Sequence, residues 1–184
     1  MQRAGGGRAR LRVMRGLRWI AVAAVGLMLG LGVLALAARF SDGPIAILAG
    51  GPLRAGELAT GPEPDWGFAR EVREIELQLL EPPRSRTTWV LVHEGRLYVP
   101  CGYMTRSWGR WWKRWPREAE RDGRAVVRIG GRRWERQAVR VLDPALFAAL
   151  AAEAGRKYGA RIPGGPPGAS DVWFFELAPR SGGS

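Results

Sequence analysis

The chain has 184 residues, with 29 Lys and Arg against 17 Asp and Glu, a formal net charge of +12 and 46% hydrophobic residues. That hydrophobic content excludes a wholly disordered chain, and the length fits one domain with a short appendage. The single cysteine, Cys101, and the single histidine, His93, exclude an internal disulfide and a zinc site built from Cys and His.

An uncharged run of twenty residues, 19–38, follows a basic segment, residues 1–18, that has six arginines and no acid. As a helix the run would be about 30 Å long, which predicts a transmembrane anchor. The positive-inside rule then places the N-terminus in the cytoplasm and the rest of the chain outside it. A cleaved signal peptide is the competing interpretation, because Ala35 and Ala37 have the small-residue spacing that signal peptidase reads. The length of the run favours the anchor, with the lipid bilayer as partner through residues 19–38.

The remaining charge is unevenly distributed. Seven arginines lie in residues 1–39, so residues 40–184 carry only +5 of the +12. Nucleic acid is therefore not an expected partner of an exported domain. Residues 40–71 are rich in Gly and Pro and predict a linker or an arm lying on the domain. Residues 40–83 carry a net −5 and residues 84–140 a net +10, so an acidic arm over a basic surface is expected.

Strand patterns dominate the predicted compact domain, residues 72–178, which precedes a flexible tail, residues 179–184. Alternation of polar and apolar residues, or enrichment in β-branched and aromatic residues, indicates six strands. They are residues 74–80, 87–93, 96–99, 124–129, 132–141 and 171–177. Glu94-Gly95 and Gly130-Gly131 predict tight turns that make hairpins of the second and third strands and of the fourth and fifth.

Two helices complete the predicted elements. Asp143 followed by Pro144 starts one, which ends at Gly155 or Gly159. The other runs from Arg106 to about Trp115 and has cations on one face and four tryptophans on the other. These are Trp108, Trp111, Trp112 and Trp115. Packing of the indoles into a barrel mouth is the favoured interpretation, a membrane interface is the second and nucleic-acid binding the weakest.

The order of elements is strand, hairpin, helix, hairpin, helix, strand. Six strands with short connections predict a mainly β fold with α: a small antiparallel barrel with two or three covering helices.

A family resemblance rests on two runs, PPRSRTTWVLVHEGRLYVPCGY from Pro82 and RAVVRIGGRRWERQAVRV from Arg124, with a Trp-bearing helix between them. Residues 75–141 resemble the split β-barrel proteins related to pyridoxamine-phosphate oxidase, most closely the deazaflavin-dependent nitroreductase-like branch. The resemblance implies a bound FMN or deazaflavin and a homodimer. The residues matched to the cofactor phosphate are Arg84, Ser85, Arg86, Thr87 and Thr88. Those matched to the ring system are Cys101, Gly102 and Tyr103.

The chemistry of residues 84–88 supports two interpretations equally, a phosphate site and a solvated turn. Residues 84–88 offer two guanidiniums and three hydroxyls, which suit hydrogen bonds to a phosphate. The alternative is a solvated turn whose hydroxyls start a strand. For His93 a surface position is favoured over a catalytic base, and for Cys101 a buried, inert thiol over a reactive thiolate.

Two functions remain as hypotheses. The first is a membrane-anchored, flavin- or deazaflavin-dependent reductase of a small or lipophilic acceptor, such as a quinone or nitro compound. In it the cofactor performs the redox chemistry and the protein holds it. The alternative is a non-enzymatic module that has lost the cofactor and binds lipid headgroups or a membrane partner. No metal is expected in either.

Overall fold

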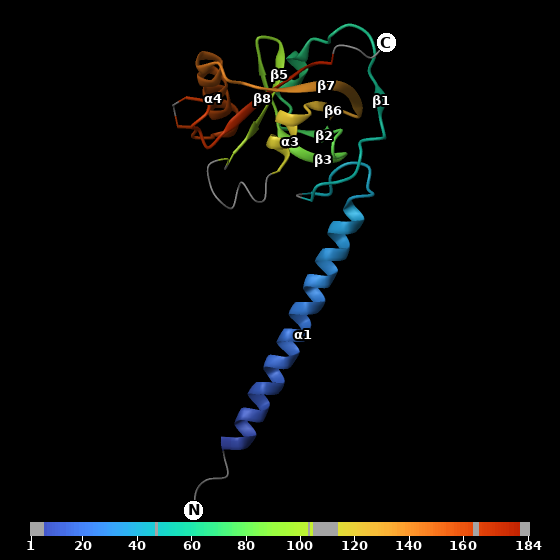
Figure 1. Cartoon of the computed structure of the whole chain (residues 1–184), viewed down its shortest axis with the longest axis vertical. Coiled ribbons are helices and arrows are strands. Elements are labelled where there is room, and N and C mark those ends of the chain that lie inside the picture. Colours follow the sequence, from blue (N-terminus) through green and yellow to red (C-terminus); the bar gives the residue numbers. More distant parts are fainter. Residues whose placement is uncertain (1–5, 47, 103, 105–113, 164–165, 181–184) are drawn as a thin grey trace, which may run out of the picture.

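The computed structural model describes residues 6–46, 48–102, 104, 114–163 and 166–180. In this part the chain is mainly β, with one curled antiparallel sheet and a long N-terminal helix, α1, that leaves the domain (Figure 1). The elements are α1 (Gly6–Ala38), β1 (Glu57–Leu58), the 3-10 helix η1 (Trp66–Arg70), β2 (Glu74–Leu79), β3 (Arg84–Trp89), β4 (Leu91–His93), β5 (Arg96–Cys101), α3 (Trp115–Arg121), β6 (Arg124–Ile129), β7 (Arg132–Arg140), α4 (Pro144–Tyr158) and β8 (Trp173–Pro179).

The strands follow the order β3-β2-β6-β7-β8-β5-β4 and pair antiparallel throughout, while the short β1 adds to β7 in parallel. This confirms a mainly β fold. The sheet curls into a half-barrel, and among the described residues no ladder joins its two edge strands, β3 and β4. The covering helices are α3, α4 and η1, each of which contributes buried side chains.

The hairpin around Gly130-Gly131 forms as predicted, because both glycines adopt positive φ, +56° and +79°, and join β6 to β7. The first hairpin differs from the prediction. Its expected first strand, residues 87–93, is divided at Val90 between β3, which pairs with β2, and β4, which pairs with β5. The main chain of Val90 is bonded to helix α4 instead of a neighbouring strand: its N–H donates to the Tyr158 hydroxyl and its carbonyl accepts from Lys157 Nζ.

Two hydrophobic cores lie on the two faces of the sheet. The larger fills the concave face and includes Leu77, Val99, Val127 and Phe175, with Trp115 of α3 packed on Phe175 at 5.2 Å between ring centroids. The smaller lies under α4. Its members are Leu91, Tyr98, Val141, Phe147, Leu150, Ala154 and Phe174.

The start of one helix was predicted, and that of the other was not. Helix α4 begins as expected, since the Asp143 carboxylate accepts from the Leu146 N–H, and it ends at Gly159, whose φ is +67°. Pro116 stands in the first turn of α3, where proline is favoured because its missing N–H is not needed there. The predicted tryptophan helix lies outside the described residues apart from its last two, Arg114 and Trp115, and its three interpretations stay untested.

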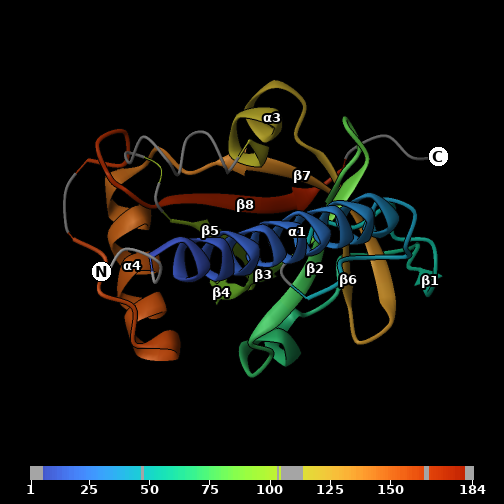
Figure 2. The same ribbon diagram turned by 90° about the horizontal axis from the view of Figure 1, so that it is seen from below.

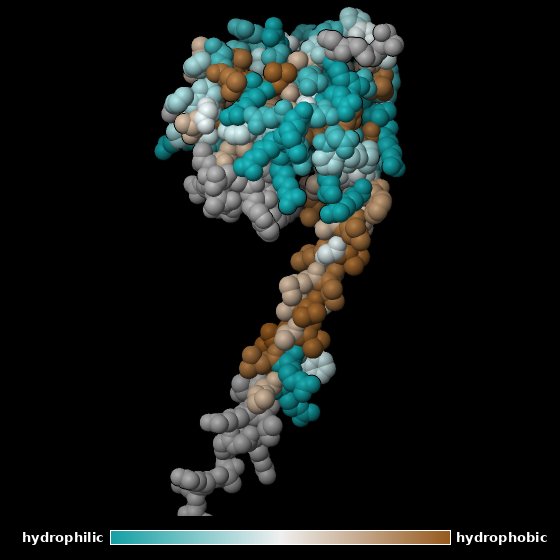
Figure 3. Space-filling view, in the orientation of Figure 1, coloured by the Kyte–Doolittle hydropathy of each residue, from teal (hydrophilic) through white to brown (hydrophobic). Residues whose placement is uncertain are grey.

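Helix α1 contains a candidate membrane span, Met14–Ala38, of 25 residues, and the most apolar 18-residue stretch in it has a mean hydropathy of 2.5. Its most apolar stretch has no residue buried against the rest of the chain, and its surface is largely hydrophobic where the domain surface is largely hydrophilic (Figure 3). A signal sequence near an N-terminus meets the same criteria of length and composition, and the orientation across a membrane stays a prediction.

Candidate functional site

Strand β3 has polar side chains on the face where its neighbour, β2, has buried apolar ones. In the β2–β3 ladder Leu77 lies opposite Arg86 and Leu79 opposite Arg84, so both arginines share the concave face with buried leucines. Directly opposed residues on paired strands point to the same side of the sheet. The edge strand therefore turns two guanidiniums toward the interior of the half-barrel, at the place where its core ends.

These side chains line a pocket of about 550 Å³, which is within the usual range for small-molecule sites. It lies between β3, β5, α3, the last turn of α1 and part of the arm, and we call it the junction pocket. Its lining residues are Ala35, Arg39, Leu48, Ala49, Arg84, Arg86, Thr87, Thr88, Pro100, Cys101 and Trp115. Seen from below, α1 runs in front of β2, β3 and β5 (Figure 2).

Arg86 is the most constrained cation of the junction pocket. Its Nε is buried and has no hydrogen-bond partner in the part of the chain that the structure describes, and its guanidinium carbon lies 5.4 Å from the centroid of the Trp115 ring. Burial lowers the pKa of Arg86 to about 10, with Glu118 and Cys101 acting in the opposite direction. The side chain is thus charged at neutral pH but poorly solvated, and an anion in the pocket would compensate it.

The charge of the junction pocket has one sign. Arg39, Arg84 and Arg86 line it, no Asp or Glu does, and among the described residues no carboxylate forms an ion pair with any of the three. Thr88, which shares the face of Arg84 and Arg86, adds a hydroxyl donor beside the guanidiniums, whereas the side chain of Thr87 alternates to the face of Ser85. This combination suits a phosphate, which accepts charge-assisted hydrogen bonds from arginine.

The other residues predicted for the site are distributed unevenly. Ser85 does not line the junction pocket, because its hydroxyl is buried on the opposite face and donates to the carbonyl oxygen of Gly51 at 2.6 Å. Cys101 is buried, with its Sγ 3.6 Å from Met104 Sδ, and Gly102 is not among the lining residues. Tyr103 and three of the four tryptophans, Trp108, Trp111 and Trp112, lie outside the described residues.

The sequence prediction missed one side of the pocket. Ala35 and Arg39 belong to the end of the apolar helix, and Leu48 and Ala49 belong to the arm. The arm reaches β3 because Gly50 exchanges main-chain hydrogen bonds with Ser85, at 2.9 and 3.2 Å. Gly50-Gly51 was the available signal, since a close approach between backbones often requires glycine, but the partner strand could not be read from it.

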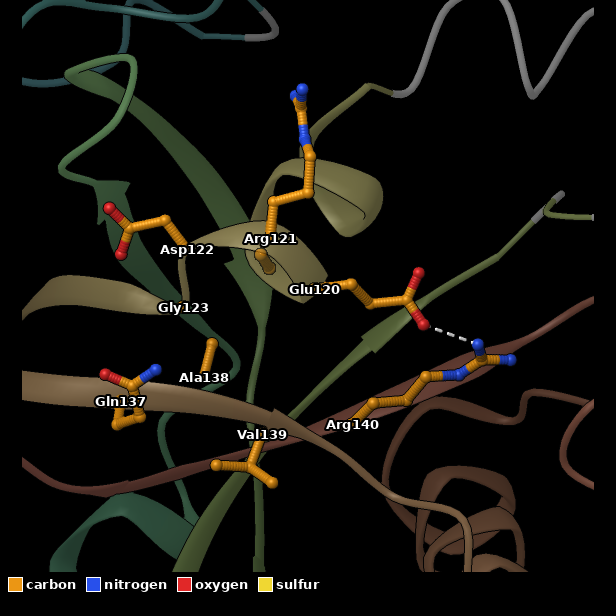
Figure 4. A pocket seen from close by; sticks show the side chains of 9 residues that line it. Glu120, Arg121, Asp122, Gly123, Gln137, Ala138, Val139 and Arg140 are labelled. Carbon is orange, nitrogen blue, oxygen red and sulfur yellow. Dashed lines mark hydrogen bonds and ion pairs between the residues drawn. The ribbon is translucent and has the colours of Figure 1, made fainter.

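Two other pockets, each of about 380 Å³, have fewer side chains suited to binding a ligand. The first lies between the end of α3 and β7, and the ion pair between Glu120 and Arg140, at 2.6 Å, lies at its side (Figure 4). The second is mostly apolar and lies beside α4, next to Phe147 and Ile162. Among the described residues no three His, Cys, Asp or Glu side chains gather as metal ligands would.

No protein-family model matches the chain, and no curated protein does. One solved structure resembles it at 15% sequence identity and a TM-score of 0.45, over 62% of this chain and 90% of the other. That structure is a Listeria innocua protein provisionally named a pyridoxamine 5'-phosphate oxidase. A likeness at this level carries no argument about function, and the residues of the junction pocket are the observations that bear on it.

Proposed function

We propose that this chain is a membrane-tethered split-barrel domain that holds a flavin-type cofactor, FMN or deazaflavin, in the junction pocket and serves as a reductase of a small or lipophilic acceptor. The observation that carries the proposal is the meeting of Arg84, Arg86, Thr87 and Thr88 with Cys101 in one pocket. The resemblance in the sequence had matched the first four to the cofactor phosphate and the fifth to the ring system.

The residues present fit such a cofactor. The buried, unpartnered Nε of Arg86 is a donor that the protein leaves open, and a phosphate oxygen would satisfy it. Pro100, Cys101 and Trp115 supply an apolar wall for a flat ring. When bound, a flavin or deazaflavin supplies the hydride chemistry. The chain's own residues would bind the phosphate, orient the ring and exclude water from it.

Cofactor binding by the full chain, in nanodiscs of phosphatidylcholine, tests the proposal. FMN and an 8-hydroxy-5-deazaflavin would each be titrated while the cofactor fluorescence is measured. We expect one of them to bind, and Arg84→Ala or Arg86→Ala to weaken it by about tenfold, as loss of a charge-assisted hydrogen bond predicts. Arg54→Ala is the matched control, because Arg54 is exposed and outside the pocket.

The proposed reductase activity is tested by the rate at which the bound, reduced cofactor is reoxidised. The bound cofactor, reduced chemically, should be reoxidised by a quinone or nitroaromatic acceptor faster than the free cofactor is. A chain that binds neither cofactor contradicts the proposal and favours the non-enzymatic module.

A further inference from the structure

The last turn of α1 is part of the wall of the junction pocket. Ala35 and Arg39, one helical turn apart, both line it, and between them Ala38 is completely buried. The Ser41 hydroxyl donates to the carbonyl oxygen of Ala38 at 2.7 Å and thereby caps the helix end. The pocket therefore belongs jointly to the apolar helix and to the domain.

The arm fixes this turn against the sheet. A Cβ at Gly51 would lie 2.5 Å from the carbonyl oxygen of Arg39, so these two backbones are in direct contact. The preceding residue, Gly50, is bonded to β3 through Ser85. Helix end, arm and edge strand thus form one continuous packed unit around the pocket.

A bilayer is the medium that fits the rest of α1. Leu31, Leu34 and Leu36, in its last two turns, are exposed, and the span ends at Ala38. Residues directly beyond such a span lie among lipid headgroups, which the long side chain of arginine can reach. With α1 across a bilayer, Arg39 would be that residue, and because it lines the junction pocket, the pocket would lie near the depth of the lipid phosphates.

We propose that the junction pocket also takes the phosphate of an anionic phospholipid from the bilayer around α1, so that lipid and soluble cofactor compete for it. The inference rests on the proposed phosphate site. Its basis is the juxtaposition of three arginines, Arg39, Arg84 and Arg86, with the end of an apolar helix, and none of the three forms an ion pair with a described carboxylate. The headgroup phosphate binds the guanidiniums while the acyl chains stay beside α1.

Lipid selectivity of the full chain tests this inference. Spin-labelled phosphatidylglycerol and phosphatidylcholine would be compared in nanodiscs, and the fraction of motionally restricted label measured. We expect about fivefold selectivity for phosphatidylglycerol, in line with one basic residue at a charged membrane surface. Arg39→Gln should abolish most of it, whereas Arg54→Gln, at an exposed arginine outside the pocket, should retain it. FMN affinity should fall as phosphatidylglycerol replaces phosphatidylcholine.

The outcomes separate this inference from the proposed function. Equal restriction of the two lipids, or selectivity unaffected by Arg39→Gln, overturns the lipid site even if FMN binds. Selectivity that is lost in Arg39→Gln, with no cofactor bound in phosphatidylcholine, supports the lipid site and contradicts the cofactor proposal. FMN binding that is indifferent to phosphatidylglycerol shows that the two ligands do not share a pocket and overturns the competition.

Discussion

Arg86 is a buried cation whose desolvation should destabilise the ligand-free domain. Its buried Nε lacks a partner and no described carboxylate pairs with it, so its desolvation is not offset by an ion pair. Arg86→Met keeps the stem and removes the charge, and we expect it to raise the melting temperature of the ligand-free chain by about 2–4 °C. Thermal unfolding in neutral detergent, followed by circular dichroism, measures this. A lower melting temperature than that of the unsubstituted chain would show that the guanidinium supports the fold itself.

A second charged residue, Asp42 in the arm, should make the stability of the fold depend on pH. Burial raises its pKa, but hydrogen bonds from the N–H groups of Arg54 and Ala55 and from the Arg128 guanidinium outweigh burial and lower the pKa from 3.8 to about 2. A lowered carboxyl pKa stabilises the fold above pH 3.8, and that stabilisation is lost as the pH falls through 2.

Asp42→Asn should therefore reduce stability at pH 6 and make little difference near pH 2. Because the side chain is about one-third exposed, solvent screening limits the effect to about 1 kcal/mol. Melting temperatures of both chains at pH 6, 4 and 2 measure it. A deficit of the variant that is equally large at all three values would assign the effect to packing rather than to charge.

At the scale of elements, the contact between arm and helix end depends on one glycine. A Cβ at Gly51 would lie 2.5 Å from the Arg39 carbonyl oxygen and 2.6 Å from that of Ser41, and both are main-chain atoms that cannot rotate away. Gly51→Ala should cost about 1–3 kcal/mol and shift the arm from β3. Gly168→Ala, at a glycine with no atom within 4 Å of a Cβ, is the control.

Amide hydrogen exchange locates that effect. Faster exchange at Gly50 and Ser85 in Gly51→Ala, with β6 and β7 unchanged, is the expected pattern. Exchange that rises uniformly across the sheet would place the damage in the global fold.

The strands were predictable where the alternation of residues and the residue types of the turn indicate the same structure. The hairpin of β6 and β7, joined by Gly130-Gly131, is the example. The first half of β3, residues 84–86, was not, because Arg84 and Arg86 are polar although they lie on the concave face, and alternation therefore could not identify a strand there. The break at Val90 depends on Tyr158, 68 residues away, and no local signal reports it. Polar residues at positions where the strand pattern predicts apolar ones often line a functional site. Arg84, Arg86 and Thr88 are such residues, and all three line the junction pocket.

At the scale of the whole molecule, the candidate site spans segments that are far apart in the chain. The half contributed by β3 and β5 was predictable through a family resemblance, since those residues lie in continuous runs. The half contributed by Ala35, Arg39 and Leu48 arises from the path of the arm, which has no periodic pattern. Tertiary packing brings the apolar helix to the pocket.

This arrangement also favours an anchor over a cleaved leader. Cleavage after Ala37 would remove Ala35 from the pocket wall and leave the buried Ala38 as a charged N-terminus, which is unfavourable in a packed site. We expect the expressed chain to retain residues 1–37 and to stay with the membrane fraction after alkaline carbonate extraction. Intact mass and the N-terminal sequence of the purified protein measure this. A soluble product that begins at Ala38 would show that the helix is a leader, and the lipid site would then lose its anchor.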